Sequence, residues 1–158
     1  MLLRKIIVSF FISTGVSTAP AMACTVPSSM SDAHGELLDS TNAERARNGL
    51  NRLRENERLR AAAQAHACDM AAQDRLSHTS SDGKNISRRL KDGGYQFGAA
   101  AENIAKNKRS APGTVDFWMN SSGHRQNLLM ANVREFGGAV AVSATGNLYW
   151  TMIVGKPR

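Results

Sequence analysis

Cysteine is scarce in this sequence, and its arrangement excludes two kinds of site. The chain of 158 residues contains two cysteines, Cys24 and Cys68, and they do not form a Cys-x-x-Cys motif. That motif is the usual signature of a dithiol redox centre or of zinc bound by cysteine. We therefore expect neither of these sites.

Other local signatures of catalysis or recognition are absent as well. The sequence has no Gly-x-Ser-x-Gly elbow, no His-Glu-x-x-His helix and no glycine-rich phosphate loop at the start of a helix. It also lacks zinc-finger and RRM motifs, so its formal net charge of +7 does not by itself predict a nucleic-acid partner. No common enzyme class is indicated by a single motif.

Long apolar runs are missing after the first residues of the chain. Arg4 and Lys5 precede an apolar stretch, Ile6 to Val16, and Ala21-Met22-Ala23 then places small residues where a signal peptidase cleaves. The stretch is too short for a transmembrane helix, and no later segment approaches about 18 apolar residues. We predict a signal peptide over residues 1–23 and a single exported domain over 24–158, in the periplasm or outside the cell.

Cleavage after Ala23 leaves Cys24 first, and two interpretations follow. Cys24 can be the acylated cysteine of a lipoprotein, although Ala21 stands where such signals usually have a large aliphatic residue. Alternatively, Cys24 and Cys68 form a disulfide, which an oxidising compartment favours. The residues favour the disulfide and leave the lipid anchor open as the alternative.

Much of the positive charge lies in one segment that also contains glutamates. Its arginines are Arg45, Arg47, Arg52, Arg54, Arg58 and Arg60, and its glutamates are Glu44, Glu55 and Glu57. One interpretation is a solvated helix–turn–helix face with local ion pairs. The alternative is a patch that binds an anionic surface such as lipid head groups or envelope polymers.

Residue patterns predict helices followed by a late hairpin, and therefore an α+β fold with helices packed over a small sheet. We expect Leu37, Leu38, Thr41 and Ala46 to form the buried face of the first helix, and His66 to be a hydrogen-bonded core residue of the second. The predicted elements are a helix from Ser31-Asp32 to Asn48-Gly49, a helix capped by Asn56 and running to Arg75, a short helix over Ile86–Lys91, a strand over Ala100–Ala105, a helix capped by Thr114 and reaching Asn120, a turn over His124–Met130, and a hairpin of Phe136–Ser143 with Leu148–Val154.

Three polar segments contain side chains that can carry chemistry. His78 and His124 lie in turns, where side chains from a rigid scaffold can converge. Glu102 interrupts an apolar run, and a buried carboxylate needs a partner. Two imidazoles and a carboxylate can bind a divalent metal with open positions, or act as acid and base.

Taken together, the motifs of this sequence resemble those of the CAP superfamily (cysteine-rich secretory, antigen 5 and pathogenesis-related 1 proteins), in its bacterial SCP-domain branch. The resemblance extends from about Leu37 to Val154. The motifs that carry it are Asn42-Ala43-Glu44-Arg45, Ala65-His66-Ala67-Cys68-Asp69-Met70-Ala71, Ser77-His78 with Asp82-Gly83, Arg89 with Gly94-Tyr95, Glu102-Asn103-Ile104-Ala105, Trp118-Met119-x-Ser121-x-Gly123-His124-Arg125-x-Asn127-Leu128-Leu129, Phe136-Gly137 and Tyr149-Trp150-Thr151.

The resemblance implies an α-β-α sandwich, with a small antiparallel sheet between helical layers and a surface cleft. His78 and His124 match the family histidines that can hold zinc or another divalent metal, and Glu102 matches the cleft glutamate. We expect Ser77, Asn103 and Asn120 to be cleft neighbours. Asn120 stands where many eukaryotic members have a second glutamate, and an amide cannot serve as a base.

Three functions remain open at this point. The missing second carboxylate favours a non-enzymatic binding module for a cell-envelope or extracellular ligand, with or without a metal in its cleft. One alternative is a metal-dependent, peptidase-like hydrolase in which Glu102 is the general base on a water held by His78 and His124. The other is a lipid-binding protein that contacts anionic membranes. In each case we expect a monomer.

Overall fold

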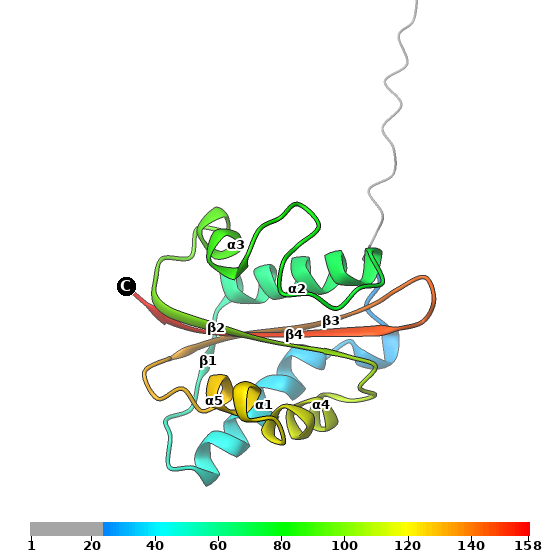
Figure 1. The fold of residues 1–158 in the computed structure, drawn as a ribbon. Helices are drawn as coiled ribbons and strands as arrows, with labels where there is room; N and C mark the ends of the chain where they lie inside the picture. Colours follow the sequence, from blue (N-terminus) through cyan, green and yellow to red (C-terminus); the bar gives the residue numbers. More distant parts are fainter. Residues whose placement is uncertain (1–23) are drawn as a thin grey trace, which may run out of the picture.

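A four-stranded sheet lies between two helical layers (Figure 1). The structure is a computed structural model that describes residues 24–158, so the predicted signal peptide lies outside the described residues. In chain order the elements are a 3₁₀ turn η1 (Ser28–Met30), α1 (Ala33–Arg47), β1 (Arg54–Glu55), α2 (Glu57–Ala72), α3 (Ile86–Asp92), β2 (Phe97–Lys106), α4 (Ala111–Met119), α5 (Ser122–Leu128), β3 (Glu135–Val142) and β4 (Leu148–Pro157).

The strand order is β1-β3-β4-β2, which makes β2 one edge of the sheet. Strand β4 pairs antiparallel with both β2 and β3, as the predicted hairpin requires. The two-residue strand β1 was not predicted, and it pairs parallel with β3. The sheet is therefore antiparallel apart from this short parallel edge.

Helices α2 and α3 cover one face of the sheet, and α1, α4 and α5 cover the other (Figure 1). Side chains of β2 alternate between the two layers, as the pleat of a strand requires. Ala101 and Ala105 belong to the core on the α1 side, whereas Ala100 and Ile104 pack on the α2 side. The α-β-α sandwich is confirmed.

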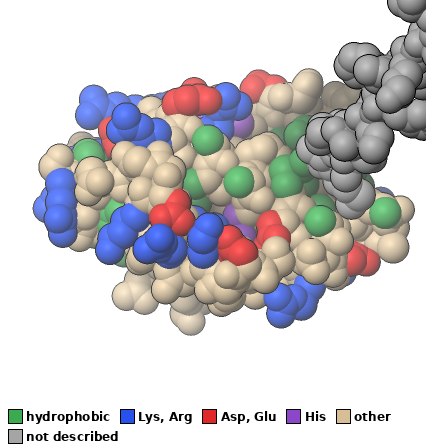
Figure 2. Space-filling model, turned by 90° about the horizontal axis from the view of Figure 1, so that it is seen from above, with side chains coloured by type: hydrophobic (Ala, Val, Ile, Leu, Met, Phe, Trp, Pro, Cys, Tyr) green, Lys and Arg blue, Asp and Glu red, His purple; other side chains and the backbone are tan. Residues whose placement is uncertain are grey.

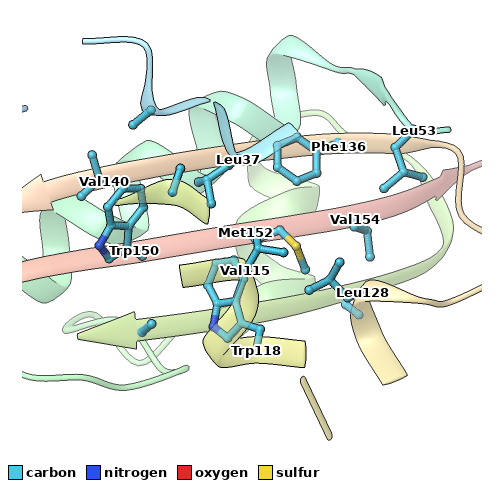
Figure 3. Packing of buried hydrophobic residues seen from close by; sticks show 14 of the residues in the cluster. Leu37, Leu53, Val115, Trp118, Leu128, Phe136, Val140, Trp150, Met152 and Val154 are labelled. Atoms are coloured by element: carbon cyan, nitrogen blue, oxygen red, sulfur yellow. The ribbon is translucent and has the colours of Figure 1, made fainter. Parts of the chain in front are cut away.

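The core on the α1 side is built around large side chains that meet between the sheet and the helices (Figure 3). Trp118 and Trp150 are fully buried there. Each indole N–H donates to a main-chain carbonyl, Trp118 Nε1 to Ile104 at 3.1 Å and Trp150 Nε1 to Lys108 at 2.8 Å. These bonds remove the cost of burying a polar group with each ring.

Helix α2 packs very close to β3 because small residues face each other at the contact. Ala63 and Ala67 of α2 are completely buried. A Cβ atom added to Gly137 of β3 would overlap the backbone of Leu59 and Arg60. The alanine-rich face of α2 and the absence of a side chain at Gly137 together set this spacing.

The predicted start is correct for α2, which ends at Ala72 and not at Arg75, and wrong for α4. Asn56 caps α2, and its side chain accepts from the N–H groups of Arg58 and Leu59 at 3.0 and 3.2 Å. Helix α4 begins earlier than predicted, because Ser110 rather than Thr114 is the cap and accepts from Gly113 N at 3.2 Å. A proline follows in this first turn, where its missing N–H costs nothing.

The solvated-face interpretation of the arginine segment is wrong for Arg45. Its side chain is fully buried, and it donates to the carbonyls of Asn51 at 2.9 Å, Leu128 at 2.9 Å and Met130 at 3.0 Å. Burial is tolerated because three main-chain carbonyls solvate the guanidinium. The other five arginines of the segment are exposed.

The buried face of α1 also differs from the prediction. Ala46 is exposed, whereas Asn42 is buried and exchanges two hydrogen bonds with the main chain of Leu53. Leu37 and Thr41 are buried as expected. A polar residue can lie on this buried face because the Asn42 side chain binds the main chain of the loop that leads to β1.

The disulfide interpretation of Cys24 is confirmed. Cys24 and Cys68 form a disulfide with a Cα–Cα distance of 5.4 Å, and Thr25 bridges to Val142 at the end of β3. These contacts attach the N-terminal arm to α2 and to the sheet. No helix in residues 24–158 is both long enough and apolar enough to cross a membrane.

Candidate functional site

Strand β2 directs two neighbouring polar side chains to opposite faces of the sheet. Both Glu102 and Asn103 are buried. The Glu102 side chain meets residues of the α2 and α3 layer, while that of Asn103 meets α5. His78 contacts Glu102 on the α2 side of β2, and the main chain of His124 is bonded to Asn103 on the α5 side.

The Glu102 carboxylate is the centre of the contacts on the α2 side. Its side chain is 2% exposed. Oε1 accepts a hydrogen bond from His78 Nδ1 at 2.9 Å, and His66 Nε2 lies 3.8 Å from the same oxygen. Oε2 is paired with the guanidinium of Arg89. Both carboxylate oxygens are therefore engaged within the protein.

Arg89 and His66 also fix the main chain of the loop that carries His78. Arg89 Nη1 donates to the carbonyls of His78 at 2.9 Å and Lys84 at 3.0 Å. His66 Nε2 donates to the carbonyl of Ser77 at 2.9 Å, and its Nδ1 lies 3.3 Å from the Ser80 hydroxyl. Burial, the largest effect, lowers the pKa of His66, so a neutral ring matches these partners.

On the other face, two asparagines hold the start of α5. Asn103 Nδ2 donates to the carbonyl of His124 at 2.9 Å, and Asn127 Nδ2 donates to Asn103 Oδ1 at 2.9 Å. Asn127 also donates to the carbonyl of Glu102 at 3.3 Å. This network fixes the position of His124 relative to the strand that carries Glu102.

His124 has a ring nitrogen that the protein does not satisfy. Its Nδ1 is buried and has no hydrogen-bond partner among the described residues. Burial lowers the pKa of His124, and the positive charge of a protonated His78 lowers it further. The aromatic ring of Phe117, which is 40% exposed, lies 6.0 Å from the imidazole between centroids.

The two imidazoles are held in different ways, that of His78 by Glu102 and that of His124 through its main chain. The His78 side chain is 58% exposed, and its Nδ1–H is donated to Glu102, so the lone pair of this ring lies on Nε2. A carboxylate behind an imidazole is a common support for a metal-binding histidine. Within residues 24–158 no three His, Cys, Asp or Glu side chains are arranged to hold a metal. Of the three residues, only the two histidines would offer neutral nitrogen ligands, which is fewer protein ligands than a structural zinc site has.

The remaining sequence-predicted residues lie near the centre without contacting its reactive groups. The Ser77 hydroxyl donates to the carbonyl of Thr79 at 2.9 Å, and the Asn120 amide donates to the carbonyl of Asp116 at 2.9 Å. In the described part of the chain neither side chain is hydrogen bonded to the two histidines or the glutamate of the centre. Among the described residues, Asn103 contacts the centre only through its hydrogen bond to the main-chain carbonyl of His124.

Sequence reasoning placed Arg89 and Asn127 among the family motifs but gave neither a role in the site, and it gave none to His66. A buried carboxylate needs a partner, but the sequence pattern did not identify Arg89 as that partner. Asn127 lies one helical turn after His124, in the Gly-His-Arg-x-Asn motif. His66 was predicted to be a hydrogen-bonded core residue, which is confirmed, but its approach to Glu102 was not anticipated.

A cleft of about 520 Å³ adjoins this centre on the α2 side. His66 and Arg89 line it, together with exposed alanines of α2, the loop over residues 80–84 and α3. Figure 2 shows hydrophobic side chains in the middle of this face, with both basic and acidic side chains around them. The cleft and the Glu102 carboxylate thus share two neighbouring side chains.

Residues 38–154 match the model of the cysteine-rich secretory protein family, CAP. This chain belongs to the CAP family. A Bacillus subtilis relative, YkwD, is 34% identical over 146 residues, which cover 89% of this chain and 56% of the relative. The chain therefore spans little more than half the length of that CAP protein.

Two solved structures have the same fold. An extracellular SCP-domain protein from Bacillus anthracis has a TM-score of 0.74 at 28% identity, over 84% of this chain and 44% of that one. An outer surface protein from Borrelia burgdorferi has a TM-score of 0.75 at 19% identity, over 82% of this chain and 96% of that one. The second likeness shows a shared CAP fold alone.

Proposed function

We propose that this CAP protein is an exported binding module, whose His78–Glu102–His124 centre recognises a cell-envelope or extracellular ligand. The observation that carries the proposal is the engagement of Glu102. One of its oxygens accepts from His78 and the other is paired with Arg89, so this buried carboxylate orients an imidazole. A general base needs a carboxylate that can reach the proton of a bound water, and this one already has two partners.

We also propose that His78 and His124 take a divalent metal such as zinc. His124 Nδ1 is a buried nitrogen without a described partner, and Glu102 holds His78 with Nε2 as its acceptor nitrogen. The lowered pKa of His124 favours the neutral ring that a metal requires. A bound cation would supply positive charge to an anionic group of the ligand, while Phe117 offers an apolar surface beside it.

Export is supported by two observations of different kinds. The Bacillus anthracis structure is described as that of an extracellular protein, and the first 23 residues have the composition of a signal peptide. The Cys24–Cys68 disulfide uses the sulfur atom that a lipoprotein anchor would need. Intact mass of the mature protein tests this, because a lipid adduct on Cys24 would contradict the disulfide.

Titration calorimetry of zinc tests the metal part of the proposal. We expect the oxidised protein over residues 24–158 to bind zinc, and His78→Ala and His124→Ala to bind at least about tenfold more weakly, which corresponds to about 1.4 kcal/mol. Thr79→Ala is the matched control, because Thr79 is exposed beside His78 and accepts through its main chain. Equal zinc affinity in all four proteins would exclude these histidines as ligands.

A cleavage assay separates binding from catalysis. The purified protein is incubated with unstructured peptides and with envelope polymers, with and without added zinc. We expect no products that depend on His124. Cleavage that is lost in both His124→Ala and Glu102→Gln would overturn the binding-module proposal and favour the hydrolase.

A further inference from the structure

The free edge of β2 has a defined set of outward-pointing main-chain groups. The N–H of Asn107 donates to the carbonyl of Leu148 at 2.8 Å. In an antiparallel pair, bonded and non-bonded positions alternate, so odd-numbered residues of β2 face β4. The N–H and C=O groups of Ala100, Glu102 and Ile104 therefore point away from the sheet.

Strand β3 has outward-pointing main-chain groups that are bonded within the protein. Along the opposite edge, every second residue of β3 is bonded from outside the strand. The pairs are Asn56 N to Phe136 O at 2.9 Å, His34 Nδ1 with Gly138 O at 3.0 Å, Gln64 Nε2 to Val140 O at 3.3 Å, and Val142 N to Thr25 O at 3.0 Å. Covering an edge in this way prevents another chain from pairing with it.

On β2, side chains bind the outward carbonyls of two residues, but not that of the next. Asn127 Nδ2 donates to the carbonyl of Glu102 at 3.3 Å, and Trp118 Nε1 donates to that of Ile104 at 3.1 Å. Among the described residues, Ala100 has no such partner for its outward N–H or C=O. Ala100 is half-buried, and the glycine that the register leaves as a bulge between Phe97 and Ala99 is exposed.

We infer that the β2 edge at Ala100 binds an extended peptide, which runs from there toward His78 and His124. One outward N–H and one outward C=O on the same residue match the two main-chain groups of a single peptide residue in an added strand. A peptide rises by about 3.3 Å per residue, so its second residue beyond Ala100 lies level with Glu102. The inference deepens the proposed function, and rests on it only for contact with the histidines.

The small side chains of this segment agree with a main chain as the ligand. Residues 98–101 read Gly-Ala-Ala-Ala, and none of these side chains is large enough to cover the edge. The side chain of Ala100 packs toward the α2 layer, not toward the edge. At Ala100 the peptide is therefore bound by main-chain hydrogen bonds. Preference for particular peptide side chains is set further along the peptide, where His78, His124 and Phe117 lie.

Amide hydrogen exchange followed by NMR tests the open edge directly. In the free oxidised protein we expect the Ala100 amide to exchange at least about tenfold faster than that of Ala101, which points into the sheet. Equal protection of the two amides would overturn the inference, because Ala100 would already have a partner. Sedimentation provides a further check, because it measures the oligomeric state. If the wild type is a dimer and Ala100→Pro is a monomer, a second copy of the chain occupies the edge.

A displayed library of unstructured ten-residue peptides, selected on the wild-type protein, provides the probe. A recovered peptide should protect the Ala100 amide, and Ala100→Pro should weaken its binding at least about tenfold. Proline removes the N–H and is tolerated at exposed strand edges. Ala100→Ser, which keeps both main-chain groups, should bind like the wild type. Recovery of no binding peptide would overturn the inference.

Histidine variants separate this inference from the proposed function. If the peptide binds His78→Ala and His124→Ala as tightly as the wild type but depends on Ala100, the edge inference stands and recognition by the histidines fails. If binding depends on the histidines and is unaffected by Ala100→Pro, the edge inference fails and the proposed function stands. Methylating the peptide amides one at a time adds a test of the main-chain bond. Methylation of the amide that donates to Ala100 should weaken peptide binding at least about tenfold.

Discussion

At the scale of single residues, Glu102 is where the contacts of the site converge. It is almost completely buried, and it joins His78 from a loop, Arg89 from α3 and, at longer distance, His66 from α2. A buried charge is stable only when it is paired and hydrogen bonded. The four side chains therefore form one electrostatic unit, and a change in any of them affects the others.

Replacing Glu102 by glutamine tests this unit. Glu102→Gln should lower the free energy of unfolding by about 3 kcal/mol, because the Arg89 side chain, 9% exposed, loses its counter-ion. Urea unfolding followed by circular dichroism measures the change. Asp39→Asn is the control, since the Asp39–Arg52 pair is exposed on both sides and contributes little. A similar loss in both variants would contradict the prediction.

The buried His66 predicts how stability depends on pH. Its pKa in the folded protein lies below the ordinary value of 6.5, so the unfolded chain binds the proton first as pH falls. The free energy of unfolding should therefore decrease as pH falls below about 6.5. Urea midpoints between about pH 7.5 and 5 measure this, and His66→Gln should flatten the slope. Stability that rises on acidification in this range would contradict it.

At the scale of elements, the contact between α2 and β3 determines the thickness of one half of the sandwich. Leu59, Ala63 and Met70 recur at helical spacing in the sequence, and all three are buried on the inner face of α2. What the periodicity did not reveal is how close the helix lies to the strand. That distance is set by Gly137, which has no side chain at the point of contact.

Gly137→Ala should destabilise the fold strongly. The added methyl group would overlap the main chain of α2, and overpacking of this kind costs about 3 kcal/mol, or more where backbone must move. Gly123→Ala in α5 is the matched control, because nothing lies within 4 Å of its added Cβ. Chemical unfolding of both variants decides the point, and equal stability would show that α2 shifts without cost.

At the scale of the whole molecule, the disulfide connects segments that are far apart in sequence. Cys24 and Cys68 are separated by 44 residues, and the loop that they close contains α1, β1 and most of α2. The bond therefore restrains the unfolded chain over a long segment. It also holds the N-terminal arm against the end of β3, where Thr25 bridges to Val142.

Removing the disulfide should lower the free energy of unfolding by about 4 kcal/mol, if the effect is mainly loss of loop entropy. The variant with Cys24→Ala and Cys68→Ala is compared with the oxidised wild type by urea unfolding. A reductant should destabilise the wild type by a similar amount and leave the double variant unchanged. A wild type that does not respond to reduction would contradict this account.

Local signals in the sequence were sufficient for most elements, whereas the grouping of His78, Glu102 and His124 depended on the family resemblance. The cap Asn56, the hairpin turn and the apolar alternation depend on neighbours in the chain, so they can be inferred without coordinates. Arg45 could not be placed in this way. Its carbonyl partners include Leu128 and Met130, which lie 83 and 85 residues away, and only folding brings them within reach.

The sequence by itself determined the family motifs, the helical and strand periodicities, and the polar residues His78, Glu102 and His124. Only the tertiary structure decided that both oxygens of Glu102 are engaged, that His124 keeps a buried nitrogen without a described partner, and that Ala100 lies on an edge strand of the sheet. The physical reason is the separation along the chain between the residues that interact. Periodicity reports burial along one element, whereas hydrogen bonds and ion pairs between layers depend on the register and spacing of segments distant in the chain.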